Sequence, residues 1–523
     1  MTVNGLFVLP KRDADYNDEE LTVPKKPKIA KPEPPSNVQF KTKATKKATK
    51  KTSSQKSLDA FFKNEQLQQQ QPIDSTLREW YWLPKFAPNV DVDVLRKTLT
   101  ACPKQAAAYS NLPPQRFPAF VETDTHIGVP RFFGWETFGK PKDSQISNGE
   151  PMADDIQFAG AIQNTEQQPQ QAAIDAWLKA SGCGLVALPC GSGKTVVAIY
   201  CAWLKKRKTA ILVHKKHLIA QWEERLKQFV PKARVGYLMQ NKVDTKDKDF
   251  VLCMIPSVSK RNYPDLHEFG TLIVDEAHHL AARTFFQSIP KFRSRYILAL
   301  SATPERKDGL TQFIYWLVGP MFFQSFRKDI RPMDITQLVY TNEPRQREIK
   351  YKNGRVASAT MIQKMVEDPQ RNAMIIQNVK TLMTKVKRVL LVGERRTHLE
   401  YLHEELTKQG LECGLYIGMM SQARLEESKN KAVVIASYGL ASEALDLQGM
   451  GGLVMCTPWG STEQVVGRLR EDKQASQRYV IDIVDPYSIF EAMARKRYRI
   501  YKDLGYNVRR CDYELPAAPS FFN

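Results

Sequence analysis

The sequence lacks any long apolar run free of charge, so no membrane-spanning helix is expected. Its eight cysteines include no CxxC pair, which argues against zinc ribbons and redox dithiols and is typical of free thiols in a reducing compartment. The N-terminal stretch holds only a short apolar segment followed by charges, so a secretory signal is not expected. An ordinary globular protein remains as the expected class.

Positive charge is distributed unevenly over the 523 residues. The net charge is +21, which favours a polyanionic partner because bound phosphates release counterions. Residues 21–63 hold twelve lysines against Glu33 and Asp59, a net charge of +10. This segment is either a solvated tail or an arm that attracts nucleic acid or an import receptor. Residues 1–71 as a whole are predicted to be disordered, because they are polar and have few periodic apolar positions.

One short motif in this basic tail concerns location. Residues 24–28, Pro-Lys-Lys-Pro-Lys, resemble a nuclear-import signal. An ordinary Lys-rich linker explains them equally well. The expected location is the nucleus, which would be the host nucleus or the virion for a viral protein.

A second motif in the tail concerns a protein partner. Residues 55–62 resemble the peptide by which replication proteins dock on the sliding clamp PCNA, with Gln55, Leu58, Phe61 and Phe62 at its anchor positions. One helical turn would place Leu58 and Phe61 on the same face. Apolar anchors in a disordered arm have no core to join, which favours a partner. A chance match is the alternative.

Short apolar stretches alternate with helical patterns in two successive regions, residues 159–325 and 346–523. Such alternation predicts two α/β domains with parallel sheets. Residues 326–345 between them are expected to form a hinge linker. Residues 72–158 are expected to form a small mixed accessory domain, because tryptophans and prolines there suggest packed but irregular structure.

A phosphate-binding loop follows a predicted strand in the first of these domains. Residues 185–188 have the pattern of a buried strand, and an apolar helix begins at Val196. This is the context of a P-loop, in which backbone N–H groups surround phosphate oxygens at the positive end of a helix. The candidate nucleotide-binding residues are Pro189, Cys190, Gly191, Ser192, Gly193, Lys194 and Thr195.

The chemistry expected of this loop is that of an ATPase. Lys194 is predicted to contact the β and γ phosphates of ATP, and the Thr195 hydroxyl to bind Mg²⁺. Another predicted strand, residues 271–274, ends in Asp275 and Glu276, and the carboxyl end of a parallel strand faces the ligand crevice. Asp275 is predicted to hold Mg²⁺, and Glu276 to take a proton from the attacking water. ATP and Mg²⁺ are therefore the expected cofactors.

The order of further motifs resembles the superfamily 2 helicases. Asp-Glu-Ala-His at 275–278 resembles their DEAH box, and Ser-Ala-Thr at 301–303 resembles the motif that links the ATP state to nucleic-acid binding. Residues 300–310 are similar to one subgroup, which contains phage UvsW, the eukaryotic XPB-type helicases and the transcript-release helicases of poxviruses and other large DNA viruses. The resemblance covers about residues 115–510 and implies two tandem RecA-like domains. It assigns coupling roles to His278, Ser301 and Thr303.

The resemblance also assigns roles outside the phosphate site. Gln171 resembles the glutamine that reads adenine, since an amide can both donate to and accept from its edge. Motif VI at 464–470 implies Gln464 as a coupling residue, with Arg468 and Arg470 as arginine fingers from the second domain. Nucleic-acid contacts are implied at Lys215, Ser257, Arg395, Ser437 and Tyr438.

The sequence departs from the family pattern at three places. Leu188 stands where Gly or Ala is usual, and Ala444 stands where Gly is usual. In motif VI, Glu471 occupies the place of the final arginine, so Arg470, one residue earlier, is the candidate for the second finger.

The function that the resemblance implies is an ATP-dependent DNA helicase or translocase that remodels branched or duplex DNA in replication, recombination or repair. The alternative is a transcription-associated helicase that releases transcripts or opens promoters. Its partner would be RNA polymerase, and RNA would join DNA among its substrates. A non-catalytic nucleic-acid-binding scaffold is a remote alternative. An iron–sulfur helicase is disfavoured, because only Cys201 and Cys253 lie between the P-loop and the DEAH box.

Overall fold

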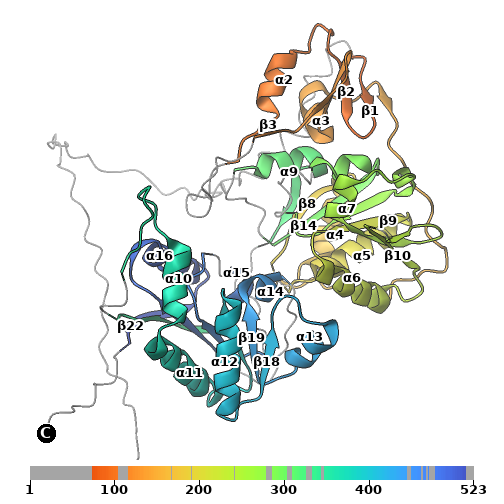
Figure 1. The fold of residues 1–523 in the computed structure, drawn as a ribbon. Coiled ribbons are helices and arrows are strands. Elements are labelled where there is room, and N and C mark those ends of the chain that lie inside the picture. Colours follow the sequence, from red (N-terminus) through yellow and green to blue (C-terminus); the bar gives the residue numbers. More distant parts are fainter. Residues whose placement is uncertain are drawn as a thin grey trace, which may run out of the picture. The chain divides into compact units, whose positions relative to one another are not determined.

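The computed structural model describes residues 73–103, 116–166, 168–189, 191–240, 242–277, 286–302, 309–325, 333–342, 347–443, 449–460, 463–466, 469 and 477–513. The basic tail, with its import-like motif and the clamp-like residues 55–62, lies outside the described residues. Three sheets of five or more strands succeed one another along the chain (Figure 1). Within the described ranges we find no helix with the length and apolar content that a bilayer crossing needs.

The first of these sheets belongs to a small accessory domain with strand order β5-β6-β2-β1-β7. The Asp91 carboxylate caps one of its helices by accepting the backbone N–H groups of Asp93 and Val94. Gly134 lies where the other helix crosses Tyr81, and a Cβ at Gly134 would come within 2.2 Å of the tyrosine ring. The elements are β1 (Thr76–Leu77), β2 (Tyr81–Pro84), α2 (Val92–Thr98), β3 (Thr100–Ala101), β4 (Phe117–Pro118), β5 (Val121–Glu122), β6 (His126–Val129), α3 (Arg131–Phe138) and β7 (Asp143–Ser144).

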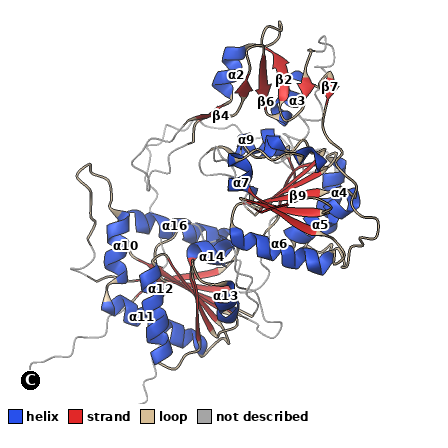
Figure 2. Cartoon of the chain, turned by 45° about the vertical axis from the view of Figure 1, so that its right-hand side comes forward, coloured by secondary structure: helices blue, strands red, loops and turns tan. Residues whose placement is uncertain are grey.

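The second sheet has the strand order β11-β10-β12-β9-β13-β14-β8-β15, and only β11 runs antiparallel to its neighbour. Its central strands β9 and β13 are buried along their whole length and mostly apolar, because helices cover both faces of the sheet (Figure 2). The strands are β8 (Cys183–Ala187), β9 (Thr209–Val213), β10 (Val235–Met239), β11 (Lys242–Asp244), β12 (Phe250–Met254), β13 (Thr271–Val274), β14 (Tyr296–Ser301) and β15 (Met321–Gln324). One face packs on α4 (Gln170–Lys179), α5 (Lys194–Lys205) and α6 (Lys216–Phe229), the other on α7 (Ile255–Lys260) and α9 (Thr311–Val318).

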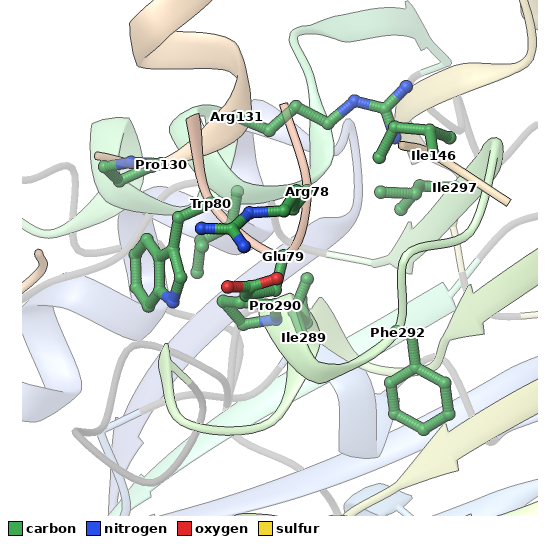
Figure 3. A pocket seen from close by; sticks show the side chains of 11 residues that line it. Arg78, Glu79, Trp80, Pro130, Arg131, Ile146, Ile289, Pro290, Phe292 and Ile297 are labelled. Carbon is green, nitrogen blue, oxygen red and sulfur yellow. The ribbon is translucent and has the colours of Figure 1, made fainter. Parts of the chain in front are cut away.

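Aromatic side chains join α3 of the accessory domain to α9. The Phe133 and Trp316 rings meet edge to face at 5.0 Å, and Trp316 meets Phe313 at 4.8 Å. A pocket in this seam is lined by residues of both domains, among them Arg78, Arg131 and several apolar side chains (Figure 3). None of its lining residues belongs to the P-loop or to the end of β13, so this pocket is not the nucleotide site.

The boundary after the accessory domain lies earlier than the predicted residue 158. Ser147 forms a bridge with Ser294, beside β14, and Glu150 accepts a hydrogen bond from the buried Lys208 ammonium at 2.8 Å. Met152 and Ile156 are buried in the core of the second sheet. Residues 147–158 therefore pack with the domain of the second sheet, which the sequence pattern does not reveal because the segment has almost no regular secondary structure.

The third sheet consists of seven parallel strands in the order β18-β19-β17-β20-β21-β16-β22. Its strands are β16 (Met333–Val339), β17 (Val389–Gly393), β18 (Cys413–Tyr416), β19 (Val433–Ser437), β20 (Gly452–Met455), β21 (Arg478–Val484) and β22 (Asn507–Asp512). The helices are α10 (Ser358–Val366), α11 (Pro369–Met383), α12 (Arg396–Lys408), α13 (Gln422–Lys429), α14 (Tyr438–Glu443), α15 (Glu463–Val466) and α16 (Ser488–Asp503). Helices α11 and α12 pack on one face, and α14, α15 and α16 on the other.

The predicted hinge at 326–345 is wrong in its second half, because β16 pairs with both β21 and β22 inside this sheet. Polar residues interrupt the strand at Asp334, Thr336 and Gln337, so its pattern does not read as a buried strand. Their partners come from elsewhere in the chain. The Gln337 amide, for example, donates to the Asp482 carboxylate and to the Ala494 carbonyl, each at 3.0 Å.

A buried ion pair ties α11 to the end of β21. The Arg371 guanidinium donates two hydrogen bonds to the Asp485 carboxylate at 3.1 and 3.0 Å, and both side chains are fully buried. Replacing Arg371 by Met should lower the free energy of unfolding of this domain by about 3–5 kcal/mol, because it leaves a buried carboxylate without its counter-charge. Hydrogen exchange in α11 and β21 would measure the loss. The double variant Arg371→Met/Asp485→Leu should recover much of it, and equal destabilisation in both variants would contradict this account.

A buried histidine should make the same domain sensitive to acid. Burial, and then the nearby Arg371 charge, lower the pKa of His398 to about 3, and its Nε2 pairs with Asn372 Oδ1 at 2.8 Å. The unfolded chain takes up this proton below about pH 6.5, whereas the folded chain does not until about pH 3. Stability should therefore fall by about 1.4 kcal/mol for each pH unit below 6.5. His398→Gln should remove this slope in hydrogen exchange of α12, while His403→Gln on the same helix should keep it.

Candidate nucleotide site

The predicted P-loop lies between β8 and α5, at the carboxyl edge of the second sheet. Gly191 and Gly193 have φ angles of 82° and 85°, which favour glycine and let the chain curl before α5 begins at Lys194. The Leu188 N–H donates to the Ser301 carbonyl at 3.0 Å, so the start of the loop is joined to the end of β14. The loop thus has the strand, turn and helix that phosphate binding requires.

The two polar side chains of the loop lie at the first turn of α5. Lys194 is half-buried, and its ammonium donates to the Leu188 carbonyl at 3.1 Å, so it lies across the loop. Thr195 follows and is also half-buried. The Ser192 hydroxyl is buried and donates to the Pro189 carbonyl at 2.6 Å, which closes the loop internally. Cys190 lies outside the described residues.

The glutamine that contacts this loop is Gln170. It is buried, its amide nitrogen donates to the Ser192 carbonyl at 3.1 Å, and its oxygen accepts the Gln163 N–H at 3.0 Å. A Cβ at Gly193 would come within 2.2 Å of the same amide nitrogen. Gln171, the predicted adenine reader, instead donates to Asp175 one turn further along α4 at 2.8 Å. The sequence offered one signal for Gln170, its place in the Pro-Gln-Gln triplet, but none for its contact.

The acidic pair lies at the end of β13, which is separated from β8 only by β14. Asp275 is 9% exposed, and its two carboxylate oxygens accept hydrogen bonds from Trp222 Nε1 at 2.8 Å and from the Glu276 N–H at 2.9 Å. Burial, and then the charge of Glu276, raise the pKa of Asp275 to about 6. Lys194 acts in the opposite direction, so its positive charge reaches the carboxylate. Glu276 has a left-handed φ of 48°, an uncommon conformation for this residue type that turns the chain sharply after the strand.

The donor set of this edge fits Mg²⁺. The Thr195 hydroxyl and the Asp275 carboxylate are hard oxygen donors at the same edge of the sheet, after β8 and β13. Mg²⁺ commonly takes one or two protein oxygens and completes its shell with water and phosphate. Among the described residues no cluster of three or more His, Cys, Asp or Glu could hold a metal by itself.

Of the residues predicted to contact nucleic acid in the first domain, Lys215 is partly accessible and Ser257 is buried. Lys215 is half-buried directly before α6, at the same carboxyl edge as the P-loop. Ser257 is only 6% exposed, and its hydroxyl oxygen accepts the Gln240 N–H at 2.9 Å. The Ser257 hydroxyl thus stabilises a turn, and its contact with nucleic acid stays a prediction. Ser301 is buried at the end of β14, whereas His278 and Thr303 lie outside the described residues.

In the second domain, too, some of the residues predicted to contact nucleic acid are partly accessible and one is buried. Arg395 precedes α12, and its guanidinium donates to the Ala359 carbonyl at 3.1 Å, while Ser437 ends β19 and is half-buried. Tyr438 is 1% exposed, donates to the Thr457 carbonyl at 2.7 Å and stacks on Trp459 at 4.6 Å. Its predicted nucleic-acid contact is wrong because the ring is part of the core. The backbone of Gln464 lies in α15, and Arg468 and Arg470 lie outside the described residues.

Comparisons with known proteins match the region that contains this site. Residues 164–306, which contain the P-loop and the acidic pair, match the family model of the type III restriction enzyme res subunit. A protein of Acanthamoeba polyphaga mimivirus, named as an ATP-dependent RNA helicase, is 32% identical over 405 residues, which cover 75% of this chain and 78% of that protein. A protein of African swine fever virus with the same kind of name is 25% identical over 62% of this chain and 70% of its own length.

Two solved structures were also similar. Phage T4 UvsW is 15% identical with a TM-score of 0.33, covering 85% of this chain and 100% of that one. S. cerevisiae Dbp5 bound to RNA and ADP BeF3 is 13% identical with a TM-score of 0.46, covering 66% of this chain and 88% of that one. These scores are low, so the fold assignment rests on the strand order described above.

Proposed function

Because this chain belongs to the superfamily 2 helicases of the large-DNA-virus group, whose members hydrolyse ATP, we propose that it uses this energy to move along or remodel branched or duplex DNA. The observation that carries the proposal is the common sheet edge. The P-loop, the acidic pair and Lys215 follow the ends of β8, β13 and β9, which lie in one parallel sheet. ATP turnover and strand contact would therefore share one rigid platform.

The proposed reaction is attack of water on the γ phosphate. Bound Mg·ATP supplies the phosphoryl group and the energy of its transfer to water. Lys194 would hold the β and γ phosphates, while Thr195 and Asp275 hold Mg²⁺. Glu276 would take the proton from the attacking water, and Arg468 and Arg470 of the second domain would stabilise the charge that develops. Closure of the domains on ATP and their release after hydrolysis would then move the strand.

The proposed contacts to nucleic acid are to its backbone. Lys215, Arg395 and Ser437 are cationic or hydroxyl side chains that suit phosphate oxygens. Such contacts carry no sequence code, so little sequence preference is expected. Affinity should fall steeply with salt, as expected for a chain of net charge +21 that displaces counterions.

The substrate is tested by ATPase stimulation with single-stranded DNA, duplex, fork, four-way junction and RNA. Our proposal expects the strongest stimulation with forks and junctions. A second candidate, an RNA-directed or transcription-associated helicase, is favoured by the names that the mimivirus and African swine fever virus relatives carry. Strongest stimulation by RNA, or co-purification with RNA polymerase, would establish that candidate. Absence of turnover with every polynucleotide would leave only the scaffold function.

We also propose a nuclear role in which residues 55–62 dock on PCNA. The supporting observation is the spacing of Gln55, Leu58, Phe61 and Phe62 within the basic tail. Replacing Phe61 and Phe62 by Ala should abolish retention of the full chain on immobilised PCNA. Replacing Phe7 and Tyr16, two aromatics elsewhere in the tail, should not. Retention of the Phe61/Phe62 variant at the wild-type level would exclude this partner.

A further inference from the structure

A tryptophan from α6 binds the acidic residue at the end of β13. Trp222 is 2% exposed, and its indole Nε1 donates to Asp275 Oδ2 at 2.8 Å in the protein interior. The indole N–H is a donor only, and it is neutral. It can therefore orient a carboxylate without adding a charge that would repel a metal ion. The two residues lie 53 positions apart in the sequence.

The second oxygen of the same carboxylate is also held. Asp275 Oδ1 accepts the backbone N–H of Glu276 at 2.9 Å. A carboxylate offers about four lone-pair sites, so two donors leave others for a metal or its water shell. With one fixed donor on each oxygen, the carboxylate plane cannot rotate freely. Groups that orient a metal ligand in this way typically change metal affinity by about 10–100-fold when they are lost.

The indole itself is held rigidly by packing. Trp222 belongs to the core cluster that also contains Val213 at the end of β9 and Leu218 on α6. Helix α6 packs against α5, β9 and β12, so it cannot shift without disturbing the sheet (Figure 2). A large ring locked by its neighbours is a suitable anchor for one precise hydrogen bond.

We propose that Trp222 is a positioning residue that fixes the Asp275 carboxylate for Mg²⁺ and thereby sets the Mg²⁺-dependent part of ATP affinity. This inference rests on the proposed role of Asp275 as a metal ligand. It adds to the site a residue that touches neither nucleotide nor metal.

The test measures binding of a fluorescent ATP analogue to the full chain, in EDTA and in excess Mg²⁺. The ratio of the two dissociation constants gives the gain that Mg²⁺ provides. In Trp222→Phe this gain should fall roughly tenfold, which is the change in affinity expected when one hydrogen bond to a charged group is lost. Affinity in EDTA should stay unchanged. Benzothienylalanine at position 222 replaces the N–H by sulfur and keeps the ring shape, so it should give the same loss even if Trp222→Phe folds poorly.

Trp177→Phe is the matched control. Trp177 is fully buried in the same domain, and its indole N–H donates to the Ile297 carbonyl at 3.4 Å, away from Asp275. It should keep the wild-type Mg²⁺ gain. An unchanged gain at position 222, or a parallel loss of affinity with and without Mg²⁺, would overturn the proposal. Asp275→Ala separates the two hypotheses: if that variant keeps the full Mg²⁺ gain, the assumed metal role fails, and if it abolishes the gain, adding Trp222→Phe should cause no further loss.

Discussion

Replacing Lys194 by Ala should lower ATP turnover by at least about a hundredfold, the usual effect of removing one group that stabilises transition-state charge. The Lys194 ammonium lies across the P-loop, 3.1 Å from the Leu188 carbonyl, and its charge reaches Asp275. Without it, nothing else in the loop offers a positive side chain to the β and γ phosphates. Phosphate release, measured with saturating DNA, would record the loss.

The control for this variant removes the same charge elsewhere. Lys179 lies exposed in the last turn of α4, in the same domain. Lys179→Ala should leave turnover within about twofold of wild type, because exposed charges distant from a site are screened by salt. DNA binding at low salt should survive in the Lys194 variant, since other cations, Lys215 and Arg395 among them, are proposed to contact the strand. Turnover near the wild-type rate in Lys194→Ala would refute the assignment of the phosphate site.

The Glu276→Gln variant should lose turnover by roughly 10²–10⁴-fold while it still binds Mg·ATP. Glutamine keeps the size of the side chain but cannot take a proton from water. The left-handed backbone at Glu276 turns the chain directly after β13, and the neighbouring Asp275 carboxylate retains both of its hydrogen-bond donors. Binding and hydrolysis should therefore separate in this variant, whereas Lys194→Ala affects both.

A fluorescent ATP analogue and single-turnover hydrolysis would distinguish the two variants. Glu224 on α6 is exposed, and Glu224→Gln provides a matched control that should turn over normally. If Glu276→Gln hydrolyses ATP at the normal rate, another group must serve as the base. If it loses nucleotide affinity as well, Glu276 contributes to binding and not only to proton transfer.

Local sequence was sufficient for the phosphate site. A buried strand, two glycines with positive φ, Lys194 and an apolar helix are all contained in one short segment, and the structure forms them as expected. The acidic pair is likewise contained in one short segment, directly after the buried strand β13. Each of these features is fixed by neighbouring residues, so no long-range contact has to be known.

Residues whose role depends on distant partners could not be predicted. Tyr438 matched a nucleic-acid motif, yet its ring stacks on Trp459, and burial removes it from any ligand. Strand β16 falls within the predicted hinge, and its polar positions do not show the apolar pattern of a buried strand. These positions are satisfied by residues of β21, α16 and β22 that only the folded sheet brings near.

The amino-acid order by itself determined the class of enzyme, the number of parallel sheets and the places of the P-loop and the acidic pair, because these follow from short contiguous patterns. Only the folded chain decided which side chains are accessible, where the domains begin and which neighbours orient the reacting groups. Gln170 at the P-loop and Trp222 at Asp275 are examples of the latter. Their roles arise from contacts between elements that lie far apart in sequence. The buried hydrogen bonds that stabilise such contacts form only once the sheet has brought these elements together.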